Sequence, residues 1–145
     1  MTAILGGWNP ARWTWHGLEH LRAATARGET VPLDWGVSRR RHGVGPGDRF
    51  YVLRQGAGQR GLVASGTVTS ETYEDAHWDG TPGRTIRYVD VVLDRVLDPF
   101  DVLPVELLQE LCPRTNWSPQ SSGTSVHPAD EERVEQLWQE HLARL

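Results

Sequence analysis

Residues 47–69, GDRFYVLRQGAGQRGLVASGTVT, contain two segments with the period-two pattern of β-strands, joined by a glycine-rich connection. The first segment, RFYVLR, carries large apolar side chains on both faces, which is typical of a buried strand. The second, LVASGTVT, alternates its residues so that one face is polar. Gly66 removes a side chain within this second strand, and such a position usually marks a bend, a bulge or a close approach by another group. The stretch predicts the central hairpin of a small curved β-barrel.

The rest of the chain predicts further strands and helices around this hairpin. Asn9 and Pro10 are typical of a helix start and Gly28 of a helix end, and proline also opens the two later helices. The expected strands cover residues 3–5, 31–37 and 85–97, and the expected helices cover residues 11–26, 104–111 and 128–145. Residues 70–83 are expected to form an exposed connection and residues 116–126 a structured loop. This order predicts an α+β fold with a single domain over residues 1–145.

The composition is typical of a soluble protein with one domain. A length of 145 residues fits the usual domain size of about 100–200 residues. No apolar run approaches the ~18 residues of a membrane span, and the N-terminus lacks a charged and then apolar signal peptide. We therefore expect a cytoplasmic protein without membrane contact. Cys112 is the single cysteine, which excludes an internal disulfide.

The charged residues exclude some enzyme classes and leave room for a nucleic-acid partner. All fifteen basic residues are arginine, so the lysine of Walker A loops and of Schiff-base enzymes is missing. The net charge is −4, but residues 1–66 hold nine arginines and four acidic residues, a net charge of +5. Residues 67–145 hold six arginines and fifteen acidic residues, a net charge of −9. A local basic surface is compatible with DNA, because phosphate contacts depend on the charges that reach the backbone.

Five motifs in sequence order resemble one known family. They are WNPARW (residues 8–13), GDRFYVLRQG (47–56), RGLVASGTV (60–68), HWD (77–79) and NWSPQSSG (116–123). Together they resemble the EVE domain, a PUA-like barrel related to YTH domains, and in particular the EVE-like modules fused to HNH nucleases in modification-dependent restriction. The resemblance spans nearly the whole chain. It implies a small curved β-barrel flanked by helices that reads a modified base and needs no cofactor or metal.

The resemblance implies an aromatic cage that receives a base flipped out of the nucleic acid. Trp35 matches the tryptophan of the family's W-x-x-R/S segment and is one expected wall, with Ser38 as a donor to the base or to a phosphate. The alternative is a tryptophan that covers the barrel mouth. Trp117, with Ser118 beside it, is the second expected wall, because a polar loop rarely buries a large ring without cause. Stacking on such rings recovers the cost of flipping the base.

The other predicted site residues are polar. Three consecutive residues are expected to contact phosphates, although a solvated basic run is the commonest meaning of such a cluster: Arg39, Arg40 and Arg41. Arg54 and Gln55 end the first strand of the hairpin and are expected either to line the pocket mouth or to form a salt bridge at the barrel end. Asp79 is able to accept a hydrogen bond from an exocyclic amine, and a structural role is its alternative.

The expected function is non-catalytic binding of double-stranded DNA with a modified cytosine, and 5-methylcytosine is the leading candidate. Recruitment of a separate nuclease stays open. One alternative is an RNA reader of the YTH or PUA kind. Another is a metal-dependent hydrolase, since His16, Glu19 and His20 form an H-x-x-E-H pattern with both histidines on one face of the expected helix. Exposed helical histidines explain this short pattern better, because Gly17 weakens the helix and no third ligand is evident, so no enzyme activity is predicted.

Overall fold

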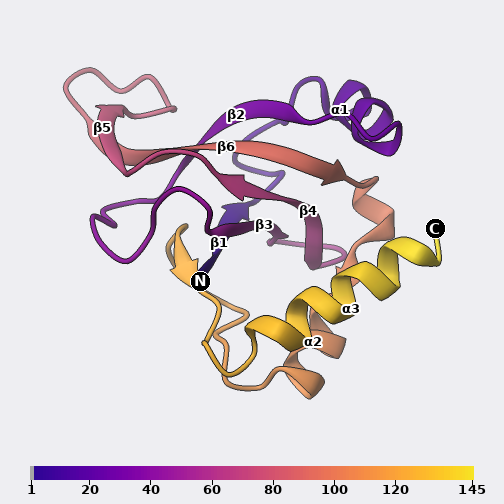
Figure 1. Ribbon diagram of the computed structural model, residues 1–145. Coiled ribbons are helices and arrows are strands. Elements are labelled where there is room, and N and C mark those ends of the chain that lie inside the picture. The colour runs from indigo at the N-terminus through magenta and orange to yellow at the C-terminus, as the bar shows by residue number, and fades with distance from the viewer. Residues whose placement is uncertain (1) are drawn as a thin grey trace.

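The computed structural model describes residues 2–145 and shows a mixed β-sheet with α1 on one side and α2 and α3 on the other (Figure 1). The strands are β1 (Ala3–Trp8), β2 (Val31–Gly36), β3 (Arg49–Arg54), β4 (Gly61–Val68), β5 (Tyr73–Ala76), β6 (Thr85–Val96), β7 (Leu103–Pro104) and β8 (Thr124–Ser125). The helices are α1 (Leu18–Ala26), α2 (Val105–Leu111) and α3 (Glu131–Ala143), with a 3₁₀ turn at Pro99–Asp101. The predicted α+β class is confirmed.

The predicted central hairpin is confirmed as β3 and β4. The inner part of β3 is buried, and this strand pairs antiparallel with β4 and parallel with β1. The pairing of β4 with β6 shifts register between Ser65 and Gly66. A Cβ atom at Gly66 would lie only 2.3 Å from the carbonyl oxygen of Val92, so this glycine permits a close approach of two backbones. The sequence pattern had predicted such a position.

The strands form an open path in the order β2-β6-β4-β3-β1-β8, with β5 added to β6 and β7 added to β4. Within residues 2–145 the two end strands, β2 and β8, do not pair with each other. The two sides are instead bridged by Ser122, which precedes β8. Its hydroxyl accepts a hydrogen bond from the backbone N–H of Gly7 at 3.0 Å and donates to the carbonyl of Gly36 at 2.6 Å. We call the gap between β1 and β2 that Ser122 bridges the seam.

The first helix is shorter than predicted. Asn9 caps a turn, since its side chain accepts from the N–H of Ala11, but the helix itself begins only at Leu18. Gly17 has a φ of 79°, which interrupts any helix that runs through it. Trp13 therefore lies on an irregular segment and not on a helix stripe.

The later segments agree largely with the sequence pattern. The expected connection at residues 70–83 contains the short strand β5, and the loop at residues 116–126 is structured and includes β8. The side chains of Val134, Leu137 and Trp138 on α3 are buried as predicted, whereas Leu145 is exposed and ends outside the helix. No helix within residues 2–145 is both long and apolar enough to cross a membrane.

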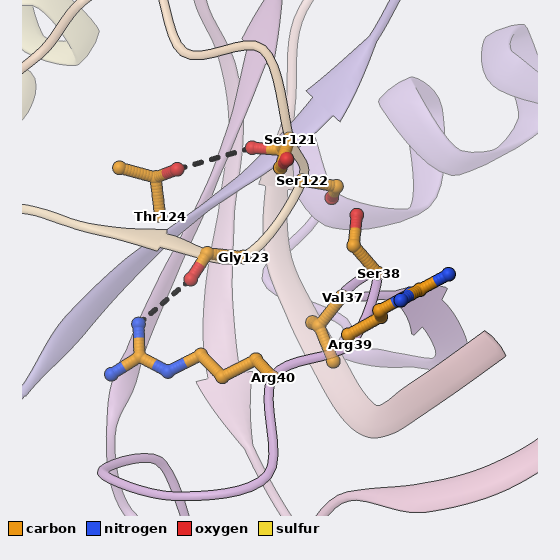
Figure 2. A pocket seen from close by; sticks show the side chains of 8 residues that line it. All are labelled: Val37, Ser38, Arg39, Arg40, Ser121, Ser122, Gly123 and Thr124. Atoms are coloured by element: carbon orange, nitrogen blue, oxygen red, sulfur yellow. Dashed lines mark hydrogen bonds between the residues drawn. The ribbon is translucent and has the colours of Figure 1, made fainter.

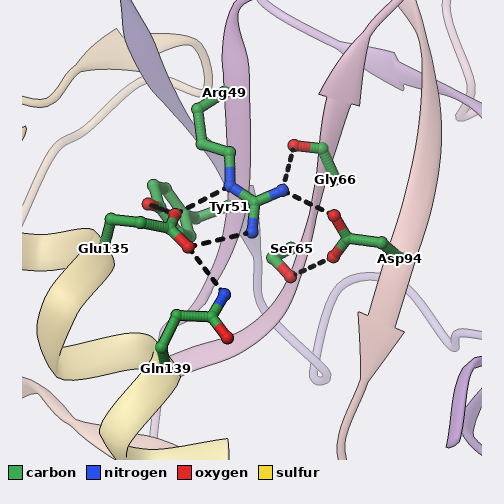
Figure 3. A network of polar contacts seen from close by, with 7 residues as sticks. All are labelled: Arg49, Tyr51, Ser65, Gly66, Asp94, Glu135 and Gln139. Carbon is green, nitrogen blue, oxygen red and sulfur yellow. Dashed lines mark hydrogen bonds and ion pairs between the residues drawn. The ribbon is translucent and has the colours of Figure 1, made fainter.

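A polar network fastens α3 to the sheet (Figure 3). The guanidinium of Arg49 on β3 donates to Glu135 on α3 at 2.8 Å and to Asp94 on β6 at 2.6 Å. The hydroxyl of Tyr51 also donates to Glu135. Burial opposes ionisation of Glu135, but the hydrogen bonds from Arg49, Tyr51 and Gln139 outweigh it and lower the pKa of this carboxyl. Three elements that are distant in sequence are thus joined through one arginine.

Candidate functional site

A hollow of about 420 Å³ lies along the seam, where the sheet is not closed by strand pairing. Its lining comes from β1, β2, β6 and the loops around them, and comprises Gly7, Trp8, Asn9, Arg12, Trp13, Asp34, Trp35, Gly36, Ser38, Arg39, Gln55, His77, Trp78, Arg84, Ile86, Tyr88 and Ser122. We call it the seam pocket. Its volume is in the range of small-ligand sites, and its lining combines aromatic rings with a few polar groups, as such sites usually do.

A cluster of tryptophans forms one side of the seam pocket. The ring of Trp35 packs edge-on against Trp13, with ring centroids 5.5 Å apart, and it also contacts Trp15 at 5.1 Å. Trp15 in turn packs on Trp8, with centroids 5.4 Å apart. A Cβ atom at Gly6 would lie 2.7 Å from Nε1 of Trp35, so this glycine makes room for the indole. Trp35 lines the pocket but leaves only 7% of its surface exposed, so its assignment as a wall of a base cage stays a prediction.

A second group of side chains reaches the pocket from the hairpin of β5 and β6. Trp78 leaves 51% of its surface exposed although it is large and apolar, and its ring lies 5.1 Å from that of His77. A Cβ atom at Gly36 would lie 2.8 Å from Cδ1 of Ile86 and 4.0 Å from Cδ1 of Trp78, so these side chains cover the backbone of β2. The hydroxyl of Tyr88 donates to the carbonyl of Ala76 at 2.7 Å, which holds this hairpin together.

The polar groups of the pocket include one residue with an unusual backbone conformation. Ser38 has a φ of 58° and is the single non-glycine residue with a positive φ in the described chain. Its carbonyl accepts from the N–H of Arg87 at 2.8 Å, while its hydroxyl has no partner within residues 2–145. Such conformations are costly and gather at functional sites. Gln55 donates to the carbonyl of Pro119 at 2.9 Å and so fixes the neighbouring loop.

The pocket mouth is basic. Arg12, Arg39 and Arg84 all line it. Arg84 forms an ion pair with Asp79 at 3.0 Å, whereas the side chains of Arg12 and Arg39 bond to no described residue. Two exposed guanidinium groups are therefore available to an anionic ligand at this mouth.

Trp117 and Ser118 are not brought to the seam pocket. The ring of Trp117 is only 2% exposed, and its Nε1–H donates to the carbonyl of Cys112 at 2.9 Å. Its surroundings are the hydrophobic core, and the hydrogen bond to Cys112 ties the indole to the end of α2. The hydroxyl of Ser118 accepts from Arg60 at 3.2 Å. The geometry does not agree with a cage whose two walls are Trp35 and Trp117.

Several predicted polar contacts have structural partners instead. Arg54 donates to the carbonyls of Ala57 and Gln59 and so closes the connection between β3 and β4; it does not line the pocket. Asp79 lies beside the pocket and holds the loop of Trp78, since it accepts from the N–H of Thr81 at 2.9 Å. Backbone and side-chain hydrogen bonds from Thr81 lower the pKa of this carboxyl.

The three consecutive arginines have three different environments. Arg40 donates to the carbonyl of Gly123 and to the hydroxyl of Ser125, each at 2.7 Å, and its burial lowers the pKa of the guanidinium. Its side chain connects two loops by hydrogen bonds and is not free to bind a phosphate. Arg41 is exposed and lies outside the pocket, so Arg39 alone of the three lines it.

Sequence reasoning missed Trp13, Trp78 and Tyr88 as pocket residues. Trp13 had been assigned to a helix stripe, and only the break at Gly17 places it in the tryptophan cluster. The sequence did indicate that Trp78 is exposed, since it lies in a glycine- and proline-rich connection and belongs to no apolar helix face or strand that would bury its ring. Nothing in the sequence indicated that Tyr88 lines a pocket, because its position in the alternating pattern of β6 is also the position expected for a core residue.

The H-x-x-E-H pattern does not form a helical metal site. His16 precedes α1, so the two histidines do not share a helix face as the alternative required, and Glu19 pairs with Arg22 at 2.6 Å. Among residues 2–145 there is no group of three histidine, cysteine, aspartate or glutamate residues placed to hold a metal ion.

Comparisons with known proteins show the fold of this chain. No family model matches the sequence, and no curated protein matches it. A solved structure of a hypothetical protein from Leishmania major superposes with a TM-score of 0.66 at 15% identity, over 98% of this chain and 97% of that one. A Pseudomonas syringae protein gives a TM-score of 0.62 at 14% identity, over 93% and 98% of the two chains. An Agrobacterium tumefaciens protein gives 0.52 at 17% identity, over 97% and 93%. The chain shares its α+β fold with these proteins over nearly its whole length.

Proposed function

We propose that this protein is a non-catalytic reader of modified DNA, with an EVE-like fold, that receives a flipped base in the seam pocket. The leading candidate for the base is 5-methylcytosine. The observation that carries the proposal is the conjunction of aromatic rings in the seam pocket with unpaired arginines at its mouth. The five motifs that resemble the EVE family support it, since four of them supply pocket residues: WNPARW, GDRFYVLRQG, HWD and NWSPQSSG.

The physics of base flipping fits this pocket. Extruding a base costs a few kcal/mol of stacking and pairing, and the cost is recovered by stacking on aromatic faces and by hydrogen bonds to the base edge. Stacking is worth about 1–3 kcal/mol per base, so two rings are enough to offset the cost. Trp35 and Trp78 are the two rings that we assign to this role, and Trp78 replaces Trp117 in it.

Polar groups beside the rings suit the edge of a base. The Ser38 hydroxyl and the Asp34 carboxylate line the pocket and have no hydrogen-bond partner in the described chain. A carboxylate accepts from an exocyclic amine, which cytosine and adenine carry and thymine lacks. The methyl group of a modified cytosine would add apolar area worth about 0.8 kcal/mol when it is buried against the pocket walls.

A pair of exposed aromatic residues allows a controlled test. Trp78→Ala removes a proposed wall that is 51% exposed, whereas Phe100→Ala removes a more exposed ring, 81% accessible, just beyond the far end of β6. We expect Trp78→Ala to weaken binding to a methylated duplex roughly tenfold, and Phe100→Ala to leave it unchanged. The measurement is fluorescence anisotropy with matched methylated and unmethylated DNA and RNA. Equal effects of the two variants would contradict the assignment of Trp78, and tighter binding to methylated RNA than to DNA would favour the RNA reader.

A further inference from the structure

A second hollow, of about 380 Å³, lies next to the seam pocket (Figure 2). It is formed by two segments that face each other, residues 37–40 after β2 and residues 121–124, which lead into β8. Ser38, Arg39 and Ser122 line both hollows, so the two are separated only by the turn that carries Ser38. No acidic residue lines the second hollow.

The residues that line this second hollow carry hydrogen-bond donors that the described chain does not use. The backbone N–H groups of Ser38, Arg39, Ser121 and Ser122 bond to no residue within residues 2–145. The Ser38 hydroxyl and the Arg39 guanidinium are also unpaired there. By contrast, the Thr124 hydroxyl donates to the carbonyl of Ser121 at 3.1 Å and is satisfied. Successive free backbone N–H groups in a turn with one left-handed residue form a concavity that attracts anions.

The two walls are held at a fixed separation. Arg40 leaves one wall and donates to the carbonyl of Gly123 in the other, as Figure 2 shows. Gly123 packs so closely on Val37 that a Cβ atom there would lie 2.9 Å from Cβ of Val37. A bound anion therefore needs little rearrangement of the protein, which favours affinity.

We propose that the second hollow binds one backbone phosphate of the nucleic acid, the phosphate adjacent to the base in the seam pocket. This inference rests on the proposed function. A nucleotide carries its base and its phosphates on one sugar, so a base on one side of the Ser38 turn brings a phosphate to the other side. The phosphate is held by the backbone N–H groups, and Arg39 extends from the same turn to close over it. Arg40 acts only through the shape of the site.

A scan with methylphosphonates tests this assignment, because such a linkage removes the charge of one phosphate and keeps its shape. Duplexes with a single 5-methylcytosine carry one methylphosphonate at successive positions, and Kd is measured for each. We expect one position, beside the modified base, to cost about tenfold in affinity and the other positions to cost much less. Arg39→Ala should shrink this cost several-fold. Arg41→Ala is the matched control, since Arg41 is an exposed neighbour outside both hollows, and it should leave the cost unchanged.

Amide NMR gives a direct readout of the backbone donors. The Ser38 and Arg39 amide resonances should shift on binding the all-phosphate duplex, and shift less with the methylphosphonate at the sensitive position. The phosphate site would be refuted by a loss of affinity that is the same at every methylphosphonate position. It would also be refuted by amide shifts that are the same with and without the methylphosphonate. Selectivity for the methylated all-phosphate duplex reports on the proposed function separately. If that selectivity is present while the scan is flat, only the phosphate site fails; if selectivity is lost, the reader function itself fails.

Discussion

Replacing Arg49 by methionine should destabilise the protein by about 2 kcal/mol, because this guanidinium is the centre of the network in Figure 3. Arg49 is 18% exposed and donates to Glu135, to Asp94 and to the carbonyl of Gly66. Breaking a fully buried pair costs about 3–5 kcal/mol. Both carboxylates are more than a third exposed and would be rehydrated in the variant, so the expected cost is lower. Methionine keeps most of the apolar stem of arginine and so limits the loss of packing.

Urea unfolding at pH 7 measures this cost, and Arg22→Met is the matched control. Arg22 forms an ion pair of the same length, 2.6 Å, with Glu19, but on the surface of α1 with 45% of its side chain exposed. Exposed pairs contribute little to stability, so this control should leave the urea midpoint almost unchanged. If the two variants lose the same stability, the network does not fasten α3 to the sheet and the reasoning is wrong.

The contribution of Glu135 also gives this difference a defined pH dependence. Its pKa is lowered in the folded protein, so its stabilisation is complete above the unfolded-state pKa of about 4.3 and is lost as the pH falls through the lower folded-state value. The stability gap between wild type and Arg49→Met should therefore narrow below about pH 4. A gap of the same size at pH 7 and pH 3 would show that the ionised carboxylate is not the partner that matters.

Two substitutions test other parts of the account. Gly66→Ala should destabilise the protein by about 1–3 kcal/mol, because the new Cβ atom would meet the backbone oxygen of Val92 and neither strand can move without breaking ladder hydrogen bonds. Thermal unfolding measures this loss. A substitution that leaves stability unchanged would contradict the close approach of the two backbones. Trp117→Phe should also destabilise the protein by about 1–3 kcal/mol, because the hydrogen bond to the carbonyl of Cys112 is lost. The variant should keep wild-type affinity for methylated DNA. A loss of selectivity in the folded variant would show that Trp117 belongs to the binding site.

Much of the sheet was predictable from sequence because alternation within a strand is a local property. The hairpin of β3 and β4, the long strand β6 and the buried stripe of α3 all follow from period-two or helical spacing of apolar residues. The need for glycine at position 66 was also local, since a missing side chain within a strand indicates a close neighbour. The identity of that neighbour, the carbonyl of Val92, depends on which strand pairs with β4, and the local pattern does not give this.

The membership of the pocket was less predictable, because it depends on contacts between distant segments. Trp117 is in a polar loop, yet its ring is buried and bonds to Cys112 at the end of α2, so local polarity was a poor guide to exposure. Trp13 was placed on a helix that does not extend to it, because a positive φ at Gly17 is compatible with the sequence but not required by it. Arg40 differs from Arg39 through its bonds to Gly123 and Ser125, which lie 83 and 85 residues away in sequence.

The central claim is that the seam pocket recognises a modified base, and a titration of wild-type protein with two duplexes that differ by one cytosine methyl group tests it most directly. Burial of the methyl group alone predicts a preference of at least about fourfold for the methylated duplex, and aromatic stacking of the flipped base should make Trp78→Ala lose most of the binding. Equal Kd values for the methylated and unmethylated duplexes, with the protein folded and at equilibrium, would contradict the account.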